Sequence, residues 1–166
     1  GLGEDTDGIM VLDATAKVGT NASEYFKLES DIVFEIGLTP NRSDAMGHIG
    51  VARDLLTVLN HKGNKLQMCK PSTKDFKVDN TSKTVEVEVA DHKICPRYSG
   101  LSISGIKVAD SSEWLQNKLK AIGIAPTNNV VDITNYVLHE IGQPLHAFDA
   151  NKIEGNRIVV SCVKEK

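Results

Sequence analysis

The clearest hydrophobic pattern in the chain lies between residues 128 and 149. Apolar residues recur there three or four positions apart, as on the buried stripe of an amphipathic helix: Val130, Ile133, Val137 and Ile141. Gly142 follows, where we expect a left-handed helix cap, and Pro144 cannot continue a helix because it lacks the N–H group. The segment from Leu145 to Asp149 is therefore predicted to turn back across the helix.

Polar side chains interrupt this apolar pattern. Thr134 and Asn135 lie inside the helix, and His146 and Asp149 lie on the returning segment. If the segment folds back, these groups can converge on a small polar pocket. A plainer interpretation stays open, in which the Thr134 hydroxyl bonds back to its own helix and His146 is an ordinary histidine beside an apolar face.

The first half of the chain predicts short strands and one longer helix. A turn over residues 3–8 leads to an apolar run at 9–12 that is typical of a strand. Residues 19–26 predict a short capped helix or a turn before a strand over 31–36. Ser43 is predicted to cap a helix that reaches about Leu59 and ends with Asn60 and Gly63. Its expected buried stripe comprises Ile49, Ala52, Leu56 and Leu59, with Arg53 and Asp54 facing outward.

Arg42, just before this helix, has two interpretations. A guanidinium beside a helix start can contact a phosphate or a partner protein. It can equally form a salt bridge that fixes the turn. One arginine carries little information by itself, so the pattern favours the salt bridge.

The second half of the chain begins after a segment of little periodicity. Residues 65–82 are lysine-rich and predict a linker, whereas 84–89 alternate strictly and predict a half-buried strand. Residues 97–108 alternate again and are expected to pair with that strand or with a strand over 157–163. Between them, Asp110 or Ser111 is expected to cap a helix that Gly123 ends, with a buried stripe of Trp114, Leu115, Leu119 and Ile122.

These elements predict an α+β fold of two small lobes, a helix-containing N-terminal lobe and a C-terminal lobe that combines a mixed sheet with helices. The expected boundaries are 31–65 for a strand-helix structural lobe, 66–83 for the linker and 84–166 for the second lobe. The missing initiator methionine and the ending just after a strand-like run suggest a fragment of a longer protein.

Composition excludes several classes of protein. With 40% hydrophobic and 25% charged residues the chain is typical of a soluble globular protein, and no segment predicts a signal peptide or a membrane span, so a cytoplasmic location without membrane contact is expected. The three cysteines and five histidines show no metal-binding spacing. A net charge of −3 disfavours a free-standing nucleic-acid binder.

The motifs NNVVDITNY and QPLHAFD, together with LTPNRSD upstream, resemble the beta subunits of bacterial phenylalanyl-tRNA synthetases. The resemblance runs from about Gly8 to the C-terminus and is weakest between Cys69 and Thr84. It implies that residues 1–30 are the tail of a tRNA-binding barrel with its connector, and that 84–166 begin an editing lobe. The implied partners are the alpha subunit, phenylalanine tRNA (held weakly by this segment alone) and the tyrosine of mischarged tRNA.

The resemblance also implies residue roles. In hydrolytic editing of tyrosyl-tRNA, His146 and Thr134 would position the water or the terminal ribose, and Asn135 would hold the amino acid. ATP and magnesium would serve the whole enzyme, with no cofactor in this segment. Two departures weaken the pocket: Ala125 stands where the family often has arginine, and the glutamate that reads the tyrosine hydroxyl lies downstream of this chain.

Two other functions compete with editing. The segment could be a structural and interaction module that supports the alpha subunit and orients tRNA without chemistry of its own, a role that residues 1–65 fit better than catalysis. It could also be an autonomous RNA-binding domain, which the acidic balance disfavours.

Overall fold

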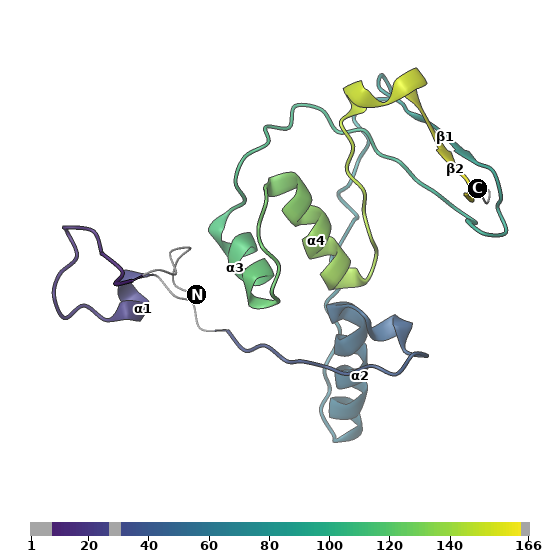
Figure 1. Cartoon of the computed structure of the whole chain (residues 1–166). Coiled ribbons are helices and arrows are strands. Elements are labelled where there is room, and N and C mark those ends of the chain that lie inside the picture. The colour runs from purple at the N-terminus through teal and green to yellow at the C-terminus, as the bar shows by residue number, and fades with distance from the viewer. Residues whose placement is uncertain (1–7, 27–30, 164–166) are drawn as a thin grey trace.

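The computed structural model describes residues 8–26 and 31–163, and within them helices and a small sheet alternate along the chain (Figure 1). The confirmed α+β class rests on four α-helices and two strands within these ranges. The α-helices are α1 (Ala22–Tyr25), α2 (His48–His61), α3 (Glu113–Ala121) and α4 (Asn129–Ile141), and the strands are β1 (Glu86–Val89) and β2 (Arg157–Val160). Three 3-10 turns complete the set: η1 (Ser43–Ala45), η2 (Ala150–Lys152) and η3 (Glu154–Asn156).

The sheet is a parallel pair of strands. Glu86 lies opposite Arg157 and Val89 opposite Val160. A parallel pair needs a long crossover, and the connection between β1 and β2 carries both α3 and α4 (Figure 1). Strands predicted over 84–89 and 157–163 are thus confirmed over shorter ranges, and Arg157 forms ion pairs with Glu88 and, more loosely, Glu86.

The other predicted strands are wrong. Residues 9–12, 31–36 and 97–108 form no strand in the described structure, and their apolar side chains are open to solvent, with Ile9 94%, Phe34 77% and Ile103 68% exposed. Alternation sets which face of a strand is apolar, but a strand also needs a hydrogen-bonding partner. The expected linker over 65–82 forms neither helix nor strand, and residues 1–7, with most of the predicted first turn, lie outside the described residues.

Two predicted helix caps are also wrong. Ser43 belongs to η1, and α2 begins only after Gly47. The turn packs tightly on the helix, because a Cβ atom at Gly50 would lie 2.0 Å from the Asp44 carbonyl oxygen. The N-cap of α3 is Ser112 rather than Asp110 or Ser111, since the Ser111 hydroxyl is bonded to α4 instead.

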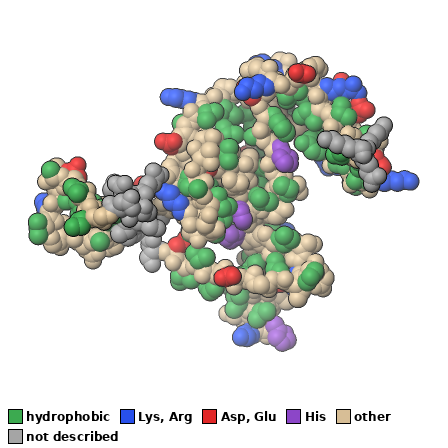
Figure 2. Space-filling view, in the orientation of Figure 1, with side chains coloured by type: hydrophobic (Ala, Val, Ile, Leu, Met, Phe, Trp, Pro, Cys, Tyr) green, Lys and Arg blue, Asp and Glu red, His purple; other side chains and the backbone are tan. Residues whose placement is uncertain are grey.

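The buried apolar side chains of the described residues are Ala45, Leu115 and Leu119. Leu115 and Leu119 confirm half of the stripe predicted for α3. Trp114 and Ile122 were wrongly placed in it, at 56% and 38% exposed, and the Trp114 ring packs edge-on against Tyr136 of α4 with centroids 5.5 Å apart. Hydrophobic side chains also appear in many places on the face shown in Figure 2.

The predicted apolar stripe of α4 is only partly buried. Val130 and Val137 are half-buried, but Ile133 and Ile141 are 53% and 43% exposed, so their placement in a buried stripe is wrong. The fully buried residue of this helix is Asp132. Its carboxylate accepts hydrogen bonds from Ser111, which precedes α3, and from the Thr127 N–H in the loop before α4.

Within the described residues, no helix is both long enough and apolar enough to cross a membrane. The helices of the described residues pack most closely in two places. Contacts join α3 to α4 side by side, and α2 meets α4 end to end, where the last turn of α4 lies over the first turn of α2 (Figure 1).

Candidate functional site

Capping residues fix both ends of α4. The Asn128 side chain accepts hydrogen bonds from the Val130 and Val131 N–H groups, each at 3.1 Å. At the other end Gly142 adopts φ +77°, and its N–H donates to the Leu138 carbonyl at 2.8 Å. The left-handed cap predicted from Gly142 is confirmed, and the chain leaves the helix there toward residues 145–149.

Thr134 is half-buried, and its hydroxyl donates to the Val131 carbonyl at 2.6 Å. The hydroxyl therefore bonds back to its own helix, as the plainer interpretation has it. Its proton is committed to that bond, while the oxygen keeps lone pairs that can accept a hydrogen bond. Asn135, also half-buried, is the next residue along the helix.

His146 is exposed on the returning segment, where its ring stacks on Phe148 with centroids 6.2 Å apart. Asp149 is occupied in a turn, since its side chain accepts the Asn151 N–H at 3.0 Å and caps η2. Among the described residues, no hydrogen bond joins His146 to Thr134 or Asn135. An imidazole this open to solvent is free to meet a ligand or a water molecule from outside.

The sequence interpretation missed a buried polar cluster beside these residues. The Ser111 hydroxyl donates to Asp132 Oδ2 at 2.5 Å, and the Thr127 N–H donates to Asp132 Oδ1 at 2.8 Å. Asp132 is 0% exposed and Ser111 is 7% exposed. Through these hydrogen bonds the Asp132 carboxylate connects the segment before α3, the loop before α4 and α4 itself. The available signal was an aspartate between two β-branched apolar residues, Val131 and Ile133.

This cluster opens onto a small hollow of about 160 Å³, lined by Asp110, Ser111, Gln116, Pro126, Thr127 and Asp132. Ala125 is exposed just before it. Asn129 makes two further hydrogen bonds. Its side chain donates to the Lys107 carbonyl at 3.0 Å, and its N–H donates to the Ala109 carbonyl at 2.8 Å. These bonds fix the start of α4 against the segment that enters α3.

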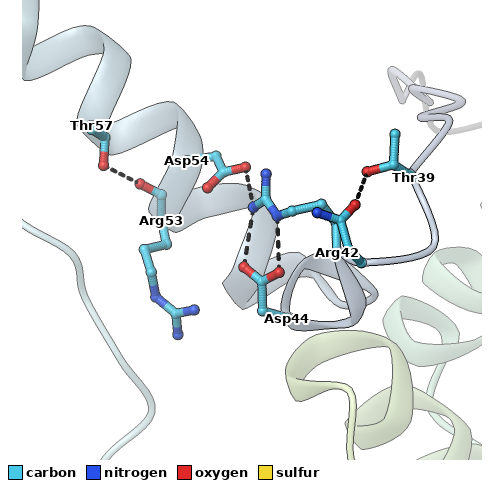
Figure 3. Close-up of polar contacts among 7 residues, drawn as sticks. Thr39, Arg42, Asp44, Arg53, Asp54 and Thr57 are labelled. Atoms are coloured by element: carbon cyan, nitrogen blue, oxygen red, sulfur yellow. Dashed lines mark hydrogen bonds and ion pairs between the residues drawn. The ribbon is translucent and has the colours of Figure 1, made fainter.

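Arg42 forms the salt bridge that its sequence context favoured (Figure 3). Its guanidinium contacts both oxygens of Asp44, at 2.9 and 3.1 Å, and Asp54 of α2 at 2.6 Å. The hydrogen bonds that Arg42 donates to Asp44 and then to Asp54 raise the pKa of Arg42 above its ordinary value, and the contact with Arg42 lowers the pKa of Asp44. Figure 3 shows the Arg53 side chain pointing away from both carboxylates.

No three histidine, cysteine, aspartate or glutamate side chains gather as a metal site in residues 8–26 and 31–163. The cysteines are free thiols, with Cys69 and Cys162 exposed and Cys95 half-buried. The candidate site comprises Thr134 and Asn135 of α4, His146 after it, and the buried cluster around Asp132.

The chain is similar to known proteins over nearly all of its length. Residues 94–166 match the family described as the B3/4 domain. The phenylalanine–tRNA ligase beta subunit of Bacteroides thetaiotaomicron is 50% identical over 165 residues, which is 99% of this chain and 20% of the relative. The beta subunit of Porphyromonas gingivalis is also 50% identical over 165 residues, with the same coverage of both chains. That of Fusobacterium nucleatum is 38% identical over 166 residues, 100% of this chain and 20% of the relative. The chain thus spans about a fifth of the length of these relatives.

Proposed function

We propose, on the ground that this chain is a homologue of one segment of the phenylalanine–tRNA ligase beta subunit, that it works within such a ligase and contributes to attaching phenylalanine to its tRNA. The observation that carries the proposal is the similarity along almost the whole chain. The alpha subunit and phenylalanine tRNA are then its partners. ATP and magnesium would then serve the whole ligase.

The finer proposal is hydrolytic editing of tyrosine wrongly attached to phenylalanine tRNA. A hydrophobic pocket built for a benzyl side chain cannot strongly reject an isostere that adds one hydroxyl. A second, hydrolytic sieve is therefore needed. The substrate is an activated ester, so its hydrolysis depends on a positioned water molecule more than on a strong nucleophile.

Three residues on and after α4 are proposed to do this work. His146 orients or deprotonates the water, Thr134 accepts a hydrogen bond from the terminal ribose or the water, and Asn135 holds the amino acid. Support comes from the open imidazole of His146 and from the free lone pairs on the Thr134 oxygen. Ala125, just before Pro126, gives this proposed site no cation.

A second candidate function is support without chemistry. The observation in its favour is the end-to-end packing of α2 on α4, which joins the first half of the chain to the second. In that case residues 31–65 hold the remainder of the ligase in place, and His146 has no catalytic effect. The two candidates make opposite predictions for substitutions at His146.

The test uses the whole ligase, assembled with a full-length beta subunit that carries this segment. Its rate of tyrosine release from tyrosyl-tRNA and its rate of phenylalanine attachment are measured for wild type and for His146→Ala. Editing predicts slower tyrosine release, by about 10²-fold if the imidazole is a general base, with phenylalanine attachment nearly unchanged. If His146 only positions the ester, the loss is smaller and nearly independent of pH.

The matched control is His92→Ala, which removes another exposed histidine outside the α4 region. It is expected to leave both rates unchanged. Equal tyrosine release by the His146→Ala and wild-type ligases would leave the supporting function as the explanation.

A further inference from the structure

The last turn of α4 and the first turn of α2 pack closely against each other. A Cβ atom at Gly47 would lie 2.8 Å from the Gly142 backbone nitrogen and 3.2 Å from the His139 carbonyl oxygen. Gly47 has φ −139° and ψ 164°, an extended conformation that any residue can adopt. The glycine is therefore required by the close approach of the two helices rather than by its backbone angles.

His48, the first residue of α2, crosses this junction. Its Nδ1 atom lies 2.8 Å from the His139 carbonyl oxygen. A carbonyl oxygen only accepts, so Nδ1 carries the proton and donates. The His139 carbonyl belongs to the last turn of α4, where carbonyl groups lack partners within the helix. His48 thus satisfies a group that the helix cannot satisfy itself.

The electrostatics of the junction agree with this contact. The N-terminal end of a helix carries partial positive charge and the C-terminal end partial negative charge. At the junction the start of α2 faces the end of α4, so opposite partial charges meet (Figure 1). The charge on the end of α4 is matched by a neighbour that is distant in sequence.

The junction lies where the returning segment begins. Gly142 ends α4 and is the residue from which the chain departs toward His146. Because a Cβ atom at Gly47 would already press on the Gly142 nitrogen, the two backbones are close, and a shift at the junction would move the start of that segment. The segment from Gly142 to His146 has no regular structure of its own to absorb or correct such a shift.

We propose that His48 is a positioning residue, which holds the end of α4 so that the following segment presents His146 in one place. The proposal rests on the hydrolytic function proposed above for His146. It gives residues 31–65 a specific task within that function, because the helix they contribute sets the geometry of a group almost a hundred positions later in the chain.

The first test measures tyrosine release by the whole ligase with His48→Ala or His48→Asn in its full-length beta subunit. His48→Ala removes the donor, and a misplacement of about 1 Å can cost on the order of 10²-fold in rate. We expect kcat for tyrosine release to fall by about tenfold or more with KM little changed. The asparagine side-chain nitrogen can occupy the place of Nδ1, so His48→Asn is expected to restore most of the rate.

The matched control is His61→Ala, at the other end of α2, where the side chain is exposed. It removes the same ring from the same helix without touching the junction, and is expected to leave kcat unchanged. Equal kcat values for His48→Ala, His61→Ala and wild type would overturn the proposal, as would a His48→Asn ligase no faster than His48→Ala.

A second readout does not depend on hydrolysis. In the isotope-labelled 166-residue chain, the amide resonances of Gly142 and His146 are expected to shift in His48→Ala and to stay near wild type in His48→Asn and His61→Ala. If wild-type ligase releases no tyrosine, the editing function fails and these spectra alone decide whether His48 positions the segment. Unmoved Gly142 and His146 resonances in His48→Ala would then overturn it.

Discussion

The Ser111 hydroxyl donates a hydrogen bond to the Asp132 carboxylate at 2.5 Å, and both side chains are buried. A buried carboxylate is costly unless donors surround it, and here one donor comes from the residue before the α3 cap and another from the Thr127 backbone. The carboxylate thereby fixes how α4 is rotated against α3. Rotation of α4 in turn determines which way Thr134 and Asn135 face.

Ser111→Ala is expected to destabilise the chain by about 1–3 kcal/mol, because it leaves a buried carboxylate oxygen without its donor. The measurement is the free energy of unfolding from urea titration. Ser112→Ala is the control, since Ser112 is exposed and its side chain makes no capping hydrogen bond. A loss at Ser111 as small as the loss at Ser112 would contradict the role given to this hydrogen bond.

Gly47→Ala is expected to cost about 1–3 kcal/mol, because its Cβ atom would press on the Gly142 backbone and the two helices would have to separate. Gly37→Ala is matched to it, because the same methyl group there meets nothing within 4 Å. That control is expected to be neutral or to stabilise by less than about 1 kcal/mol. Both changes are followed by thermal unfolding, and equal effects of the two would argue against a tight junction.

The helices of this chain could be predicted from the sequence because their signals are local. The spacing of Val130, Val137 and their neighbours, with Gly142 behind them, predicts α4 almost to the residue, and Gly123 marks the end of α3 in the same way. The strand over 97–108 was wrong because pairing is not local. The partner of β1 is β2, which is about seventy positions further along the chain, and alternation alone does not choose between candidates.

In the candidate site, too, the local features could be predicted from the sequence and the long-range contacts could not. Thr134 and His146 could be singled out because their residue types break an apolar pattern and lie in the segments whose wording resembles a known family. The contacts of Asp132 with Ser111, and of His48 with His139, could not be predicted, because each joins residues 21 or 91 positions apart. An aspartate within an apolar helix was a sign of a buried partner, but nothing in the sequence named that partner.

The contribution of the Arg42 salt bridge to folding stability is expected to depend on pH. Arg42 holds the pKa of Asp44 below its ordinary value, so the bridge stabilises the fold above the pKa of unfolded aspartate, about 4. This contribution is lost as the pH falls through the lower pKa of the folded state. Arg42→Gln is therefore expected to lower the urea midpoint at pH 7, and the difference from wild type is expected to shrink as the pH falls below about 4.

Arg53→Gln is the control for this experiment. Arg53 is exposed and points away from Asp44 and Asp54 (Figure 3), and it lowers the pKa of Asp44 less than Arg42 does. Its effect on the midpoint is expected to be smaller at pH 7. A constant difference between Arg42→Gln and wild type from pH 7 down to pH 2 would mean that the Asp44 carboxylate is not what Arg42 stabilises.

The Thr134 hydroxyl is expected to contribute to the function proposed for α4. Its proton is bonded to the Val131 carbonyl at 2.6 Å, so a ligand can only use the oxygen as an acceptor. Thr134→Val keeps the shape of the side chain and removes that acceptor, whereas Thr134→Ser keeps it. In the whole ligase, Thr134→Val is expected to slow tyrosine release by about tenfold, the equivalent of one hydrogen bond of about 1.4 kcal/mol, and Thr134→Ser to stay within about threefold of wild type. Stability is expected to change little in either variant, because the Val131 carbonyl can also bond within the helix. Tyrosine release as fast in Thr134→Val as in Thr134→Ser would show that the hydroxyl serves the helix alone.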